Sequence, residues 1–175
     1  SEGLVGCEIG CQPCSITCGW GGAGAFSDGK LTLSPEVGGW LADFTGREEL
    51  KRLIAYVDGI YVEFGAPEKI HGTDRDQVEE IRRRAMQVEL ELIDAPIRHM
   101  GTDRCPEVLQ AMRKELDQRV EVATHTTVEK LIVRDGRAAG VRLKDGTVIG
   151  ARVVIAAPGR EGSSWLVEEA RELGL

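Results

Sequence analysis

The sequence predicts an α/β protein, and three observations along the 175-residue chain carry that prediction. Residues 1–34 are rich in glycine and cysteine, which is typical of loops joined to short strands. Residues 41–98 place apolar side chains at helical spacing, and residues 127–157 alternate β-rich runs with Asp-Gly turns. We therefore expect three segments: a Cys/Gly-rich part (1–40), a mostly helical insertion (41–98), and a helix, three-strand β-meander and closing strand and helix (99–175).

Composition narrows the class of partner. The net charge is −7, which argues against a nucleic-acid binder because such proteins need a basic surface. No apolar run reaches the length of a membrane span, and the first residues lack the basic and apolar parts of a secretory signal. We expect a cytoplasmic protein that acts on a small molecule.

The insertion begins with a helical pattern between Pro35 and Glu63. Leu50, Leu53, Ile54 and Val57 recur at three- and four-residue steps, and Gly65-Ala66-Pro67 then breaks the helix.

A second helix is expected after residue 74. Asp74 and Gln77 have the spacing of a capping box, and Ile81, Ala85 and Val88 form an apolar stripe. Arg82, Arg83 and Arg84 lie among glutamates, which favours a solvated ion-pair face over an anion site.

Residues 93–100 are apolar and interrupted by Pro96, which predicts an edge strand or an extended linker. The patterns HGTDR (71–75) and HMGTDR (99–104) both precede helices, and we expect their Thr or Asp to cap those helices.

The last third is β-rich. Asp135-Gly136 and Asp145-Gly146 predict two tight turns in an antiparallel meander over 127–157. Its final run, ARVVIAAP, is almost continuously apolar, as in a strand buried on both faces. Pro158-Gly159 ends that strand, and Ser163 or Ser164 is expected to cap a closing helix.

This order of elements, together with GRAAGVRLKDGTVIGARVVIAAPG (136–159), resembles the FAD-binding domain of the glutathione-reductase-like flavoproteins with two dinucleotide-binding folds. GWGGAGAFSDGKLTLSPEVGG (19–39) and IRHMGTDRCPEVLQAMRKEL (97–116) resemble a group of FAD-dependent dehydrogenases within it. The resemblance implies a partial FAD/NAD(P)-binding Rossmann-like domain and FAD-dependent oxidoreduction, with NAD(P)H left open as the reductant.

Flavoproteins of this kind also hold the FAD pyrophosphate with a G-x-G-x-x-G turn between a strand and a helix. No G-x-G-x-x-G turn set between an expected strand and an expected helix occurs in these 175 residues, and the family's C-terminal Gly-Asp element does not occur either. We therefore expect the chain to be an internal piece of a longer flavoprotein, partnered by the missing N- and C-terminal parts, and to bind FAD weakly by itself.

The glycine loop and the meander supply the expected cofactor contacts. Glycines permit close backbone approach, Ser27 and Lys30 suit a phosphate, and Asp28 can orient Lys30 or accept from a hydroxyl. The alternative is a tight loop packed against its own domain. By position, the resemblance adds an adenine contact at Val128 and a turn at 156–159, where Pro158 removes one N–H. The full cofactor-binding set is Gly21, Gly22, Ala23, Gly24, Ser27, Asp28, Lys30, Val128, Ala156, Ala157 and Gly159.

Four cysteines form a compact box, with the spacing C-x3-C-x2-C-x3-C at Cys7, Cys11, Cys14 and Cys18. Thiolates at such spacing can hold zinc or an iron–sulfur cluster, or Cys11 and Cys14 can form a redox pair. Thiols without a catalytic role are the third alternative. Cys105 lies far from the box and is expected to be structural.

Among the three histidines, His99 is the candidate for proton transfer, because it lies beside Arg98 and ahead of Gly101 in the expected substrate region. His71 and His125 are expected to be structural. Two other functions remain open: a metal-binding or electron-transfer module built on the cysteine box, and a folded fragment without catalysis.

Overall fold

The computed structural model describes residues 18–25 and 27–175. These residues form two compact units. The first unit comprises residues 23–120, and the second comprises residues 121–175, with which residues 18–22 cluster. Each unit is described by itself.

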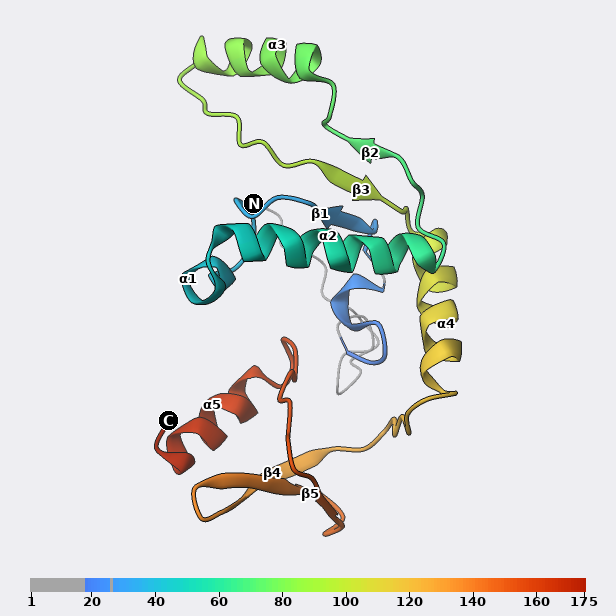
Figure 1. Cartoon of the computed structure of the whole chain (residues 1–175), viewed down its shortest axis with the longest axis vertical. Helices are drawn as coiled ribbons and strands as arrows, with labels where there is room; N and C mark the ends of the chain where they lie inside the picture. The colour runs from blue at the N-terminus through green and yellow to red at the C-terminus, as the bar shows by residue number, and fades with distance from the viewer. Residues whose placement is uncertain (1–17, 26) are drawn as a thin grey trace, which may run out of the picture. The chain divides into compact units, whose positions relative to one another are not determined.

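The first unit is built around a small antiparallel sheet (Figure 1). Its strands are β1 (Lys30–Thr32), β2 (Ile70–His71) and β3 (Ile97–His99), in the order β1-β3-β2. The 3-10 helix η1 (Gly22–Gly24) comes before β1. The α-helices are α1 (Leu41–Thr45), α2 (Arg47–Glu63), α3 (Arg75–Met86) and α4 (Arg104–Leu116).

Helix α2 confirms the helix expected before residue 65. Leu50 on its apolar side is buried, and the helix ends at Glu63, just before the break at Gly65-Ala66-Pro67. Of the two alternatives for 93–100, an edge strand or an extended linker, the edge strand is wrong, because β3 pairs with β1 on one side and with β2 on the other. Residues 93–96 belong to no helix or strand, as the linker alternative expects. Pro96 precedes the strand, and its carbonyl accepts a hydrogen bond from Leu33 N at 2.8 Å, so the missing N–H of proline does not interrupt the pairing.

The two expected Asp caps differ. Asp74 Oδ1 accepts from the N–H groups of Asp76 and Gln77, each at 3.1 Å, which confirms the cap of α3. Asp103 makes no such bond at α4, because its own backbone is helical (φ −74°, ψ −37°) instead of extended like that of Asp74.

The second unit confirms the β-meander. Strands β4 (Val128–Arg134), β5 (Arg137–Leu143) and β6 (Val148–Gly150) pair antiparallel in that order. Asp135 and Gly136 both have positive φ (51° and 72°), which matches a two-residue hairpin turn of type I′. Gly140 in β5 must be a glycine, because a Cβ there would lie 2.1 Å from the Ile149 carbonyl oxygen.

Helix α5 (Ser163–Leu173) protects the free edge of β4. Glu169 Oε2 accepts from Leu131 N at 2.7 Å, and Trp165 Nε1 donates to Glu129 O at 2.8 Å. The expected serine cap is wrong, because Gly162 precedes the helix and Ser163 Oγ instead donates to Arg160 O at 2.8 Å.

The expectation of a buried strand along ARVVIAAP is also wrong. The last strand of the meander ends at Gly150, and residues 152–157 pair with no strand in the described part of the chain. Val153 is 75% exposed and Ile155 is 88% exposed. A strand with apolar side chains on both faces needs a sheet edge and two covering layers, which the described residues do not provide.

The structure confirms the fold class in its coarse form, a mixture of helices and two small antiparallel sheets. Few apolar side chains are buried among the described residues: Leu50, Ala66, Cys105, Val108 and Leu143. No helix in the described ranges has the length and apolar character needed to cross a membrane.

Candidate functional site

The first unit brings together four residues for which the sequence analysis predicts cofactor binding or proton transfer. Ser27, Asp28 and Lys30 lie in and just after the loop that enters β1, and His99 ends β3. Lys30 is the register partner of His99 across the β1–β3 pair. Since opposite residues of antiparallel strands share a face, the Lys30 and His99 side chains lie on one face of the sheet.

Hydrogen bonds shape the loop before β1. Ser27 Oγ donates to Gly24 O at 2.8 Å and accepts from Gly29 N at 3.1 Å. Met100 N donates to Gly29 O at 2.8 Å and Gly101 N donates to Asp28 O at 3.1 Å, so the loop continues the pairing of β1 with β3. The Ser27 hydroxyl therefore holds the turn together through both of its hydrogen bonds.

Gly29 sits where no side chain fits. Its φ is +65°, and a Cβ at this position would lie 2.3 Å from the Cys105 sulfur. Cys105 is buried at the start of α4, and burial raises the pKa of its thiol. The thiol form is therefore favoured, in line with the expected structural role of Cys105.

The exposed side of this sheet carries opposite charges. Lys30 Nζ and an Asp28 carboxylate oxygen are 2.5 Å apart, and both side chains are about half exposed. The hydrogen bond from Lys30 lowers the pKa of Asp28, and together with the nearby Lys30 charge it outweighs the opposite effect of burial. Asp28 is therefore ionised at neutral pH and holds Lys30 in place.

A second histidine, which the sequence analysis expected to be structural, lies beside His99. The rings of His71 and His99 meet edge to face, with centroids 6.3 Å apart. Each histidine is the first residue of a related pattern, HGTDR or HMGTDR. This similarity was the feature of the sequence that could have indicated a shared role for His71 and His99. Two imidazoles, an ammonium and a carboxylate on one open face can bind an anionic group and exchange a proton with it.

A buried ion pair anchors this sheet from its other face. The Arg98 guanidinium donates to both carboxylate oxygens of Asp58 on α2, at 2.6 and 2.7 Å, and also to the carbonyl of Pro67. The exposed fractions of the Arg98 and Asp58 side chains are 5% and 14%. Because Arg98 precedes His99, the pair fixes the strand that presents His99.

The predicted glycines at 21–24 form an open turn. Gly22 has φ +56° and its N–H donates to Gly19 O at 3.0 Å. A Cβ at Gly22 or Gly24 would meet no heavy atom within 4 Å. Ala23 and Gly24 are exposed, whereas Gly29 at the end of the same loop is packed against Cys105, so the cofactor contact and the packed-loop alternative both stay open.

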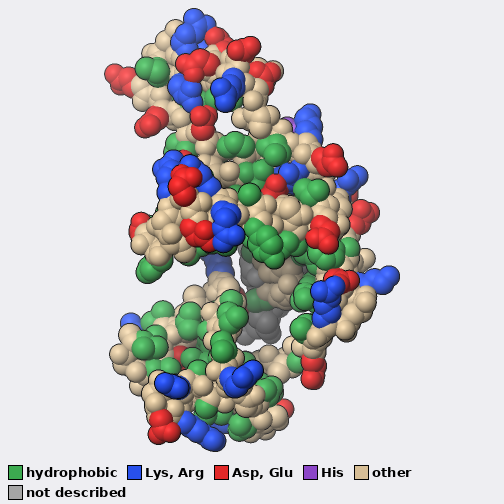
Figure 2. All heavy atoms as spheres, viewed as in Figure 1, with side chains coloured by type: hydrophobic (Ala, Val, Ile, Leu, Met, Phe, Trp, Pro, Cys, Tyr) green, Lys and Arg blue, Asp and Glu red, His purple; other side chains and the backbone are tan. Residues whose placement is uncertain are grey.

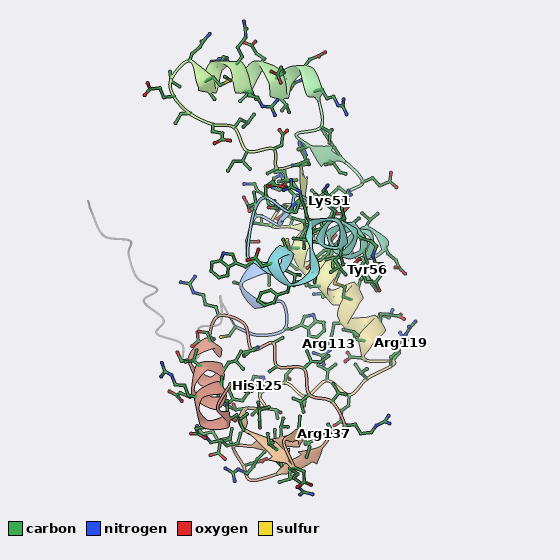
Figure 3. All side chains as sticks on the ribbon, turned by 60° about the vertical axis from the view of Figure 1, so that its left-hand side comes forward. Lys51, Tyr56, Arg113, Arg119, His125 and Arg137 are labelled. Atoms are coloured by element: carbon green, nitrogen blue, oxygen red, sulfur yellow. The ribbon has the colours of Figure 1, made fainter. Side chains whose placement is uncertain are left out.

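The remaining cofactor positions lie in the second unit. Val128 opens β4, and next to it in the chain is a polar pocket of about 360 Å³ lined by His125, Thr126, Thr127, Leu143, Lys144 and Asp145. His125 is labelled in Figure 3. Ala156 and Ala157 are exposed, and Gly159 has φ +67°. The contacts predicted for these residues stay predictions.

The cysteine box falls mostly outside the described residues. Cys7, Cys11 and Cys14 are not among them, and Cys18 is half-buried. In residues 18–25 and 27–175, no group of three or more His, Cys, Asp or Glu side chains could hold a metal ion. The metal, cluster and redox-pair hypotheses therefore stay open.

Comparison with known proteins assigns no family or function to these residues. No protein-family profile matches the chain, and no curated protein matches its sequence.

Proposed function

We propose that the chain forms part of an FAD-dependent oxidoreductase of the glutathione-reductase-like type, acting on a small molecule. The observation that carries the proposal is that the Ser27–Lys30 loop lies beside His99. Lys30 and His99 are 69 positions apart in the sequence, and the resemblance assigns the loop to the cofactor and His99 to the substrate region. The exposed residues Ala23 and Gly24 precede this loop.

The chemistry of these residues fits a dinucleotide. The exposed backbone of Ala23 and Gly24 and the Lys30 ammonium, which also pairs with Asp28, suit phosphate oxygens. In the second unit, taken by itself, the polar pocket next to Val128 has hydroxyl groups that suit an adenosine. FAD, when bound, would accept or deliver the hydride. His99 would hold or release a proton on the substrate side, with His71 beside it.

The exposed apolar side chains at 152–157 support the proposal that another part of the same flavoprotein packs against this segment. Its alternating faces both carry apolar side chains, and both Val153 and Ile155 are exposed. In a Rossmann-like domain such a segment lies within a parallel sheet covered by helices. We propose that the missing strand-turn-helix unit of the same flavoprotein supplies that sheet.

The proposal is tested by titrating ADP and FAD into the isotopically labelled chain and following the backbone amide resonances. We expect weak binding, with shifts confined to Gly22–Gly24, Lys30 and the pocket around Thr127 and Lys144, because one part of the phosphate cradle is missing. The variant Lys30→Glu should remove the shifts around the glycine turn, while Lys114→Glu on α4 should leave them unchanged.

Two results would contradict the proposal in different ways. If neither group of amides responds to ADP or FAD, the assignment of these residues to a dinucleotide is wrong. If FAD binds with micromolar affinity, the cofactor assignment holds but the chain does not need the missing unit.

A further inference from the structure

A pocket that the proposed function does not use lies between β1 and the helices α1 and α2 of the first unit. Its volume is about 320 Å³, at the lower end of the range of about 300–1,000 Å³ that is typical of small-molecule sites. Seven of its ten lining residues are leucine, isoleucine or valine. Figure 2 shows hydrophobic side chains over this part of the unit, next to charged ones. The pocket therefore has the apolar walls and the size of a site for a small molecule.

The pocket is separate from the group of residues around His99. Leu31, which lines the pocket, is the register partner of Arg98, and opposite residues of antiparallel strands share a face. Arg98 bonds to Asp58 on α2, so this face of the sheet is turned toward α2. The side chains of Lys30 and His99 lie on the other face. A ligand in this pocket would therefore lie across the sheet from the His99 imidazole.

The charged groups among the lining residues already have partners. Asp58 accepts hydrogen bonds from Arg98 on both carboxylate oxygens, at 2.6 and 2.7 Å. Lys30 Nζ lies 2.5 Å from an Asp28 carboxylate oxygen. A charged ligand would lose its hydration in the pocket without gaining an unpaired counter-ion from either residue. The lining therefore favours an uncharged ligand.

The pocket is open to solvent, and its length limits what can fill it. Leu41 on α1 is 47% exposed and Val57 on α2 is 48% exposed. Because aliphatic walls cannot hydrogen-bond to water, an apolar ligand that displaces water from them is favoured. On α2 the lining runs from Leu50 to Asp58, roughly 12 Å at 1.5 Å per residue, which suits a single ring or a short chain and is too short for a helix of several turns.

We propose that the pocket between β1 and α2 binds a small, uncharged, apolar molecule. Cyclohexylmethanol is a suitable probe, and it is titrated into the methyl-labelled 175-residue chain in the absence of flavin. We expect saturable shifts of the Leu31, Leu53 and Ile54 methyl resonances with a Kd of roughly 1 mM, as a ligand with few heavy atoms allows.

Two charged analogues of the same shape test the chemical class of the ligand. Cyclohexanecarboxylate and cyclohexylmethylamine should each bind roughly tenfold more weakly than cyclohexylmethanol, because each must lose the hydration of its charge. Tighter binding of either charged analogue would overturn the assignment to an uncharged ligand.

Two pairs of variants test the location. Val57→Trp places an indole in the pocket and should weaken binding of cyclohexylmethanol by roughly tenfold or more, whereas Ala55→Trp, at an exposed position of α2 outside the lining, should leave it unchanged. Leu41→Asp puts a charge into the apolar wall and should weaken binding by a similar factor. Its control is Phe44→Asp, on the same helix, at a residue that is 85% exposed and outside the lining.

Far-UV circular dichroism checks that each variant is folded. The proposal is overturned if the methyl resonances do not respond to cyclohexylmethanol, or if each variant and its control change the affinity equally. The titration with ADP and FAD follows the glycine turn and the pocket of the second unit, so its failure leaves this proposal standing, and the reverse also holds.

Discussion

At the scale of the residue, the Arg98–Asp58 ion pair is the contact on which the position of His99 depends. Its two hydrogen bonds are short, and both side chains are largely buried. We predict that Asp58→Asn lowers the free energy of unfolding by roughly 3 kcal/mol, because it leaves the buried Arg98 charge without its counter-ion. Chemical denaturation measures this change, and it should also broaden or shift the His99 imidazole resonances.

Glu63→Gln is the matched control, since Glu63 lies on the same helix and is exposed. It should change the stability by no more than about 0.5 kcal/mol. An equal loss in both variants would show that the Arg98–Asp58 pair contributes no more than any acidic residue of α2.

At the scale of the element, Glu169 joins α5 to the edge of β4. Burial tends to raise the pKa of Glu169, but the Leu131 N–H, the hydrogen bond from Lys130 and nearby positive charge outweigh it, so the pKa lies below its usual value. The ionised carboxylate is therefore favoured in the folded state. The ionised Glu169 carboxylate stabilises the folded state fully at pH values above the pKa of Glu169 in the unfolded chain, which is near 4.3. This stabilisation is lost as the pH falls through the lower pKa that Glu169 has in the folded state.

We predict that Glu169→Gln destabilises the second unit by about 2 kcal/mol at neutral pH, because a charged acceptor of the Leu131 N–H becomes a neutral one. The difference from the wild type should shrink as the pH falls below about 4. Thermal unfolding across that range checks both statements. The exposed neighbour Glu168→Gln should show neither effect, and a loss independent of pH would contradict the role given to the carboxylate.

At the scale of the whole molecule, much of the apolar surface of the described residues is uncovered, and the segment 152–157 shows it best. Ile155 is exposed, so we predict that Ile155→Asp changes the free energy of unfolding by less than about 0.5 kcal/mol and lowers the binding of a hydrophobic dye. Val108→Asp is the contrasting variant. Val108 is almost fully buried, and a charge there should prevent stable folding.

Denaturation curves of the Ile155→Asp variant decide this prediction. A large loss of stability would show that residues 152–157 are packed in the isolated chain, and the argument for a covering sheet would then fail.

The sequence by itself determined the features that depend on neighbours along the chain. The apolar spacing of α2, the Asp74 cap and the Asp-Gly hairpin turn at Asp135-Gly136 follow from the dihedral preferences and reach of a few residues, and the structure confirms each. The assignment to an α/β protein follows from the same local patterns.

Only the tertiary structure decided which distant residues meet. It places His71 beside His99, pairs Arg98 with Asp58, makes β3 the central strand and leaves residues 152–157 uncovered. None of these follows from local spacing, because they depend on strand register and on which surfaces are available to cover an apolar segment. The sequence pattern of 152–157 describes a strand that needs a sheet on its edges, and that sheet is not formed by the described residues.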